Sequence, residues 1–165
     1  MKIGGFLTFV GSSVICTIII IYIVASISFD MKCTQYLKRA GDANTVELAS
    51  LNLETAKSYL EIRNLTNGIV SIFLRQPEND IEFWYSNISA CQNELVNVSP
   101  DATQLERSNL LMKLRETLID SGERGDVITC PEGISVYPYN ALLFLLFWIG
   151  FIVAVTGVIK MAIDV

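Results

Sequence analysis

Cysteine thiols are the groups in this sequence most able to form a covalent bond. Cys33, Cys91 and Cys130 lie in the charged middle of the chain, where a compartment outside the cytosol would allow one disulfide and leave one thiol over. If the three helices of this middle region run away from the membrane, back toward it and away again, Cys91 on the second helix and Cys130 on the returning segment lie at similar distances from the membrane. We therefore predict a Cys91–Cys130 bridge, with Cys33 free or bonded to another chain. Pairing Cys33 with Cys130 would need a compact segment after the last helix of that domain. The alternative is that Cys91 is a core thiol and nothing is bridged.

Residues that catalysis and metal binding usually need are scarce. The chain has no histidine, which removes the commonest general base and the commonest zinc ligand. It also has no Gly-rich phosphate loop, nucleophile elbow or dinucleotide fingerprint. We therefore predict no catalytic residue, no metal site and no cofactor, and a protein that is not an enzyme.

Carboxylates form two groups that we interpret as structural. One group recurs every seven residues, at Glu47, Glu54 and Glu61. Each of these follows an apolar seam position and so faces solvent, with Lys57 in reach for ordinary helix ion pairs. The other group lies at a predicted helix start, where negative charge suits the helix dipole: Glu78, Asp80 and Glu82.

Phe83, Trp84 and Tyr85 form an aromatic run that cannot all face inward on one helix. Trp84 falls on the predicted core face, so Phe83 and Tyr85 are candidates for partner contact. The alternative is a core groove wide enough to hold all three rings. The sequence also has three glycosylation sequons, at Asn64, Asn87 and Asn97, which matter only for a lumenal domain of a eukaryotic protein.

Apolar periodicity predicts the helices that carry these residues. Two seams of alternating three- and four-residue spacing predict helices over residues 45–66 and 80–97. Asn44 with Glu47, and Asn79 with Glu82, are the expected caps. Ser99 and Pro100 predict the start of a third helix over residues 100–121. We expect its core stripe at these residues: Leu105, Met112 and Ile119, with Leu111, Leu114 and Leu118 beside them.

Three segments of the middle are less regular. Residues 31–40 either continue the first apolar stretch as a stalk or end at Gly41, which marks a kink or a reversal. Residues 68–74 are apolar and short, and we expect them to cover one end of the core; the alternative is that they dip into the lipid. Residues 126–138 are expected to be extended and to return the chain to the membrane.

Two apolar stretches are long enough to cross a bilayer. Residues 3–29 and 141–159 carry no Asp, Glu, Lys or Arg, and about 20 such residues span the hydrocarbon core. A cleaved signal peptide with a Ser26-Ile27-Ser28 cleavage site is the alternative for the first stretch, but its apolar core exceeds the usual length. In the second stretch Gly150, Ala154 and Gly157 share one helix face, where the first stretch or a partner helix can approach closely. The alternative is that Gly and Ala are simply common in membrane helices.

Flanking charge predicts the orientation of these stretches. Lys2 and Lys160 favour cytoplasmic termini. Lys32, Lys38 and Arg39 oppose this, although a loop of more than about 60 residues crosses largely regardless of its charge. We predict an integral membrane protein with both termini cytoplasmic and the central domain periplasmic, extracellular or lumenal. The net charge of −5 disfavours nucleic-acid binding.

The sequence therefore predicts a mainly α protein in which two transmembrane helices flank an antiparallel bundle of about three helices and an extended return segment. The expected parts are residues 1–29, 30–138, 139–160 and a short cytoplasmic tail, 161–165. The expected function is a non-catalytic, membrane-anchored interaction protein, acting as an accessory or assembly subunit or scaffold of a membrane complex, with a membrane-protein partner or a second copy of itself.

Two other functions remain open. One is a ligand-sensing module that signals to a membrane partner, with Thr55, Ser108 and Asn109 as polar groups inside a pocket between helices. The other is a thiol-based enzyme at the membrane surface, acting through Cys33.

Overall fold

The chain is mainly helical, as predicted, with 74% of the residues that the structure describes in helices. The structure is a computed structural model that describes residues 3–122 and 125–163. The α-helices are α1 (Ile3–Phe29), α2 (Gln35–Gly41), α3 (Val46–Ile62), α4 (Ile81–Val96), α5 (Gln104–Leu118) and α6 (Asn140–Ile163). A π-helical turn (Asp30–Thr34) joins α1 to α2, and β1 (Ile119–Gly122) and β2 (Gly125–Ile128) form a hairpin.

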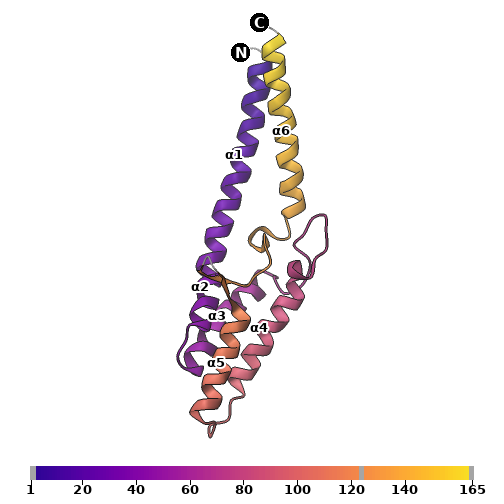
Figure 1. Ribbon diagram of the computed structural model, residues 1–165. Coiled ribbons are helices and arrows are strands. Elements are labelled where there is room, and N and C mark those ends of the chain that lie inside the picture. Colours follow the sequence, from indigo (N-terminus) through magenta and orange to yellow (C-terminus); the bar gives the residue numbers. More distant parts are fainter. Residues whose placement is uncertain (1–2, 123–124, 164–165) are drawn as a thin grey trace. The chain divides into compact units, whose positions relative to one another are not determined.

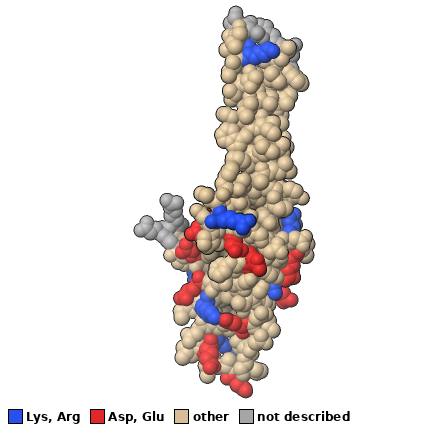
Figure 2. Space-filling model, turned by 90° about the vertical axis from the view of Figure 1, so that its right-hand side faces the viewer, with Lys and Arg blue, Asp and Glu red and all other residues tan. Residues whose placement is uncertain are grey.

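The chain divides into two compact units, which we call the terminal unit and the central unit. Residues 1–27 and 135–165 make the terminal unit, and residues 28–134 make the central unit. Figure 1 shows α1 and α6 in the terminal unit and the shorter helices in the central unit. In Figure 2 charged side chains gather over the shorter helices, whereas α1 and α6 show an uncharged surface for most of their length.

Two helices are long and apolar enough to cross a membrane by length and composition: Ile3–Gly41 and Asn140–Ile163. Only 11% and 17% of their most apolar windows are buried in the protein, whereas the core helix of a soluble protein would be mostly buried. Lys2 and residues 164–165, which the predicted orientation and tail involve, lie outside the described residues.

The predicted seams of α3 and α4 are confirmed as the core of the central unit. Every seam residue is buried: Val46, Ala49, Leu53, Ala56 and Leu60 on α3, and Ile81, Trp84, Ile88, Cys91 and Leu95 on α4. The two helices are antiparallel neighbours, because Gln92 Nε2 donates to Ser50 Oγ at 3.2 Å near one end and Tyr85 bonds Glu61 near the other. Helix α2 packs against both α3 and α5.

The helix caps differ from the predicted ones by one to four residues. Thr45 and Asp80 cap α3 and α4, one position after the expected Asn44 and Asn79. Helix α5 begins four residues later than predicted, because Thr103 and Glu106 form a complete capping box there. In each case the cap that forms is the one whose oxygen reaches a free backbone N–H.

The predicted core stripe of α5 is wrong in part. Leu105 is 70% exposed and Met112 is 57% exposed, whereas Leu114 and Leu118 are buried. Leu114 lies two residues after Met112, and two residues rotate a helix by about 200°. The face of α5 that carries Leu114 and Leu118 therefore packs against the other helices, and the face that carries Leu105 and Met112 is exposed.

Residues 31–40 continue the first apolar helix as a stalk, and the segment after α5 is more compact than expected. The helix continues from α1 through the π-helical turn to Gly41, where Asp42 forms its C-cap. Helix α5 ends at Leu118, and β1 then pairs with β2 in an antiparallel hairpin from Ile119↔Ile128 to Gly122↔Gly125. Residues 126–138 therefore contain a strand and a short 3₁₀ turn (Ile134–Val136) rather than one extended run.

The apolar loop between α3 and α4 covers the core only at its beginning. Leu65 and Val70 are buried, and Val70 N donates to Asn79 O at 3.0 Å. Phe73 and Leu74 are 74% and 70% exposed. The expectation that residues 68–74 all cover the core is therefore wrong for the end of this segment.

Candidate functional site

The central unit carries an apolar groove of about 440 Å³ between α4, the end of α5 and the hairpin. The buried side chains of Trp84, Ile88 and Leu118 line it, and the exposed side chains of Phe83 and Val127 stand at its edge. Acidic residues also contribute to its lining: Glu78, Asp80 and Asp120. The groove thus combines an aromatic and aliphatic interior with a negatively charged margin.

Trp84 fixes the interior of this groove. Its indole Nε1 donates to Thr129 O at 2.5 Å, and Thr129 N donates to Leu118 O at 2.9 Å. Three segments that are distant in sequence therefore meet at one ring. A tryptophan suits this position because its body is apolar and its single donor needs a partner when buried.

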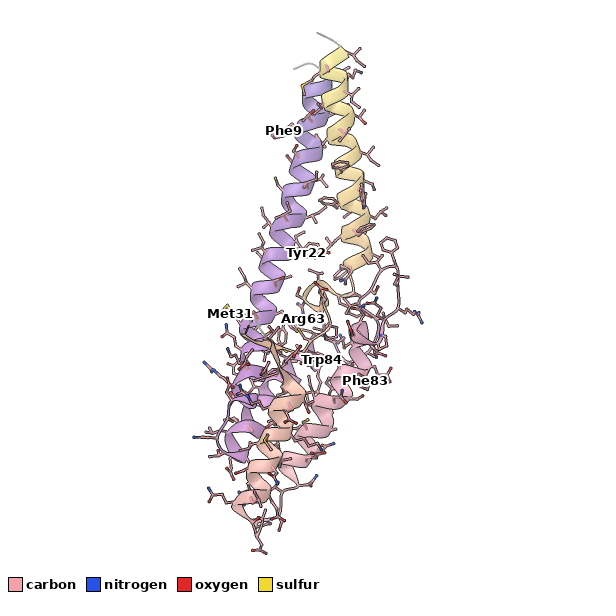
Figure 3. The ribbon with its side chains drawn as sticks, in the orientation of Figure 1. Phe9, Tyr22, Met31, Arg63, Phe83 and Trp84 are labelled. Atoms are coloured by element: carbon pink, nitrogen blue, oxygen red, sulfur yellow. The ribbon has the colours of Figure 1, made fainter. Side chains whose placement is uncertain are left out.

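Phe83 lies beside Trp84 on α4 but faces outward. It is 64% exposed, against 8% for Trp84, and Figure 3 shows both side chains on α4. The start of this helix is held by Asp80, whose Oδ1 accepts from Phe83 N at 3.1 Å. Because this bond holds the backbone of Phe83 in the first turn of α4, the helix determines the direction in which the Phe83 side chain points.

Tyr85, the other predicted contact residue, is engaged within the central unit. Its hydroxyl donates to Glu61 Oε1 at 2.6 Å, and Lys57 Nζ lies 5.9 Å from the ring centroid. Burial raises the pKa of Tyr85, and the hydrogen bond to Glu61 raises it further. Tyr85 therefore ties α4 to α3, and Phe83 is the more exposed of the two.

All four cysteines are free thiols in the structure, so nothing supports the predicted Cys91–Cys130 bridge. Cys33 and Cys91 are buried, and Cys130 is half-buried beside the groove. Burial raises the pKa of each of these thiols. Reactive cysteines have a lowered pKa and partial exposure, so Cys33 has the opposite of a nucleophile's surroundings.

Two carboxylates of the seven-residue repeat, those of Glu47 and Glu61, form ion pairs. Glu47 Oε1 lies 3.3 Å from Arg107 Nη1, and Glu61 Oε1 lies 3.8 Å from Lys57 Nζ. Within residues 3–122 and 125–163, no group of three or more metal-ligating side chains comes together.

The three sequon asparagines differ in accessibility. Asn64 is exposed and has a positive φ of 54°. Asn97 is exposed at the C-cap of α4, where its Nδ2 donates to Asn93 O at 2.8 Å. Asn87 is half-buried and lines the groove, so a glycan at that position would occupy the groove.

The terminal unit has its own contact surface, in which α1 and α6 touch backbone to backbone. Gly150 and Gly157 are buried, and Ala154 is half-buried. A Cβ on Gly157 would lie 2.5 Å from Thr8 N, and a Cβ on Gly11 would lie 2.5 Å from Ala154 N. Neither position has room for a side chain, which is how close helix pairs in membranes are built.

Larger side chains fill the other end of this helix pair. Ile18, Val136 and Leu143 form a buried cluster, with Phe147 packed against it. Tyr22 and Phe144 join Ile18 and Leu143 around a small apolar pocket of about 290 Å³. Figure 1 shows α1 and α6 close together near the termini and farther apart toward the start of α6. Residue size therefore sets the distance between the two helices.

Sequence reasoning missed two parts of these surfaces. Gly4 and Gly11 in α1 have the same seven-residue spacing as Gly150 and Gly157, and that match is a signal that would have identified both faces. The contribution of Val127 to the groove depends on the hairpin, which brings β2 back beside α5. Searches of family models, curated proteins and solved structures found no match to this chain.

Proposed function

We propose that this chain is a non-catalytic, membrane-anchored interaction protein that serves as an accessory or assembly subunit, or a scaffold, of a membrane complex. In this proposal α1 and α6 both cross the bilayer, and both termini are cytoplasmic. The central unit lies on the opposite side and binds its partner through the groove beside Phe83.

The lengths and surfaces of α1 and α6 support the membrane anchor. At 1.5 Å per residue, 27 and 24 residues reach about 40 and 36 Å, more than the ~30 Å hydrocarbon core. The contact between the two helices also favours an uncleaved α1 over a signal peptide. Removal of α1 would leave the Gly150 and Gly157 face of α6 without the helix that covers it.

The exposed aromatic ring over an apolar groove is the observation that carries the proposed binding role. Phe83 and Val127 are 64% and 60% exposed, which is a high cost in water for side chains of this size. Aromatic residues beside a desolvated pocket are typical of the centres of protein interfaces. The acidic lining selects a partner segment with apolar side chains flanked by Lys or Arg. That segment belongs to a membrane-protein partner or to a second copy of this chain.

Site-specific photocrosslinking in native membranes tests this role. A benzoylphenylalanine in place of Phe83 reports what lies against the groove, and the same probe in place of Leu105 is the matched control. Leu105 is 70% exposed on α5 and is not among the groove-lining residues. We expect a discrete crosslinked product from position 83 and none from position 105.

The same pair of positions provides a loss-of-binding test. Phe83→Ala removes the ring but not the fold of α4, so it should abolish copurification of the crosslinked partner in mild detergent. Leu105→Ala should leave copurification unchanged. A clean monomer from wild-type membranes, with no product at position 83, would contradict the proposal.

The groove also keeps the ligand-sensing function open as a second candidate. Its volume of about 440 Å³ lies within the ~300–1,000 Å³ usual for small-molecule sites. The polar residues expected inside a pocket do not serve it, because Thr55, Ser108 and Asn109 are exposed. A panel of amphiphilic cations, tested by thermal shift on the full chain in detergent, distinguishes the two functions. A shift that Phe83→Ala removes would favour sensing.

A further inference from the structure

The hairpin keeps Cys130 close to the end of α5. After β2 pairs with β1 as far as Ile128, Thr129 N donates to Leu118 O at 2.9 Å. Thr129 O in turn accepts from Trp84 Nε1 at 2.5 Å. The residue before Cys130 is therefore held on both sides, against α5 and against α4. This is the compact return that a Cys33–Cys130 pair requires.

Cys33 lies on the buried face of the helix that packs along α5. Cys33, Leu37 and Ala40 recur at helical spacing, and all three are 0% exposed. Gly41 at the end of this helix lies against the Ile119 side chain, and Asp42 pairs with Arg115. One face of α2 thus packs against the end of α5, where the hairpin begins.

The Cys130 thiol lies close enough to Cys33 to affect its pKa. Burial is the main cause of the raised pKa of Cys33, and the Cys130 thiol raises that pKa further. The Cys91 thiol instead interacts with the Thr117 hydroxyl and lies near Glu94 and Lys113, in the contact between α4 and α5. Cys130 therefore has Cys33 as its neighbour, and Cys91 has other partners.

We propose that Cys33 and Cys130 are a disulfide pair, which forms when the central unit folds in an oxidising compartment, and that Cys91 stays a core thiol. The compartment rests on the proposed function, which places the central unit outside the cytosol. The oxidant is the disulfide of a thiol–disulfide oxidoreductase. Its two sulfurs are reduced to thiols as the Cys33 and Cys130 thiols lose two protons and two electrons and form one S–S bond.

This bond would close the central unit where the chain enters and leaves it. Cys33 lies a few residues after the unit begins, and Cys130 a few residues before it ends. The closed loop holds about 100 residues, and a disulfide restricts the unfolded chain more as the loop that it closes grows longer. Because the Cys33 thiol is protonated and inaccessible once it is buried, the bond forms during folding, before Cys33 is covered.

Folding in the presence of an oxidant tests the pairing without relying on membrane topology. The full chain is synthesised in a cell-free system into detergent micelles, with reduced and oxidised glutathione present from the start. Free thiols are then alkylated under denaturing conditions, and the chain is cut after basic and acidic residues. We expect a reducible crosslink between the peptides that carry Cys33 and Cys130, with Cys91 alkylated.

Variants make the assignment specific. Cys130→Ser should leave Cys33 fully alkylated, and Cys91→Ala, the matched control, should leave the Cys33–Cys130 crosslink intact. Reduction should lower the unfolding temperature of the control on the order of 10 °C and should not change that of Cys130→Ser. A crosslink between Cys91 and Cys130, or alkylation of all three thiols, would overturn the pairing.

The same peptide analysis on protein from native membranes separates this proposal from the proposed function. A crosslink in native membranes supports both the pairing and the location outside the cytosol. A crosslink that forms with glutathione but is absent from native membranes supports the pairing and contradicts the location.

Discussion

The Trp84 indole holds three segments of the central unit together, through its bond to Thr129 O at 2.5 Å. Trp84→Phe keeps an aromatic ring in the core but leaves this carbonyl without its donor. The expected loss is about 1–3 kcal/mol of unfolding free energy. Thermal unfolding of the full chain in detergent, followed by circular dichroism, measures it.

The chain has two tryptophans, so Trp148 provides a matched control. Trp148 is 45% exposed on α6 and contacts aromatic rings along its own helix. Trp148→Phe should leave the unfolding temperature of the central unit unchanged. Equal losses from both substitutions would show that the Thr129 bond contributes nothing particular.

A single methyl group tests the contact between α1 and α6. A Cβ on Gly11 would lie 2.5 Å from Ala154 N and 2.6 Å from Gly150 O. Gly11→Ala must therefore separate the two backbones, at a cost of about 1–3 kcal/mol. Disulfide trapping between cysteines placed at Ile18 and Leu143, which pack together in one buried cluster, measures the separation, and we expect its yield to fall several-fold.

Gly5→Ala adds the same methyl group to the same helix without this conflict. The nearest atom to its Cβ would be Met161 Sδ at 3.8 Å, an ordinary contact distance. The trapping yield should match that of the parent chain. If Gly11→Ala also matched the parent, the helices would not be packed through their glycines.

The N-terminal cap of α5 predicts a specific response to acid. Hydrogen bonds from the Thr103 backbone N–H, and then from its hydroxyl, hold the pKa of Glu106 below its ordinary value of 4.5. A depressed folded-state pKa means that the carboxylate stabilises the fold fully above about pH 4.5. That contribution is lost as pH falls through the lower folded value. Acid titration of helicity by circular dichroism should show this loss.

Glu106→Gln removes the ionisable group and should flatten the part of the titration below pH 4.5. Glu116→Gln is the matched control, because Glu116 is exposed near the other end of the same helix. That substitution should leave the acid response of the cap in place. Identical acid titrations for the parent and Glu106→Gln would show that the cap does not contribute.

The helices with strong apolar periodicity were predictable from the sequence. The seams of α3 and α4 lie in the core at every predicted position, because burial of a helix face follows directly from the spacing of apolar residues. The predicted apolar stretches likewise correspond to α1 and α6. The starts of α3 and α4 differ from the predicted ones by one residue, since neighbouring Asn, Thr and Asp side chains can each cap a helix.

The elements that depend on contacts distant in sequence were not predictable. Nothing local in the sequence separates the Leu114 face of α5 from the Met112 face, and only packing against α2 and α4 decides between them. The hairpin is set by pairing between Ile119 and Ile128 across Gly122 and Gly125. Its consequences, the groove at Val127 and the neighbourhood of Cys33 and Cys130, follow from that pairing alone.

The two units of this protein divide its chemistry between them. Among the described residues, the ion pairs lie in the central unit, for example Lys113 Nζ with Glu94 Oε1 at 2.6 Å. Helices α1 and α6 expose apolar side chains such as Phe9 and Ile152, which are 68% and 61% accessible in the absence of lipid. Such surfaces are stable only in contact with hydrocarbon or another apolar surface. The proposed function therefore requires a bilayer that receives both helices.

Labelling with a membrane-impermeant maleimide in intact cells tests this claim most directly. Single cysteines are placed at Glu82 in the central unit and at Ile163 at the end of α6, both exposed positions. We expect labelling of position 82 in intact cells, and of position 163 only after the membrane is permeabilised, with the chain still bound to membranes after an alkaline wash. Protection of position 82, or a mature chain that has lost residues 1–28, would contradict this claim.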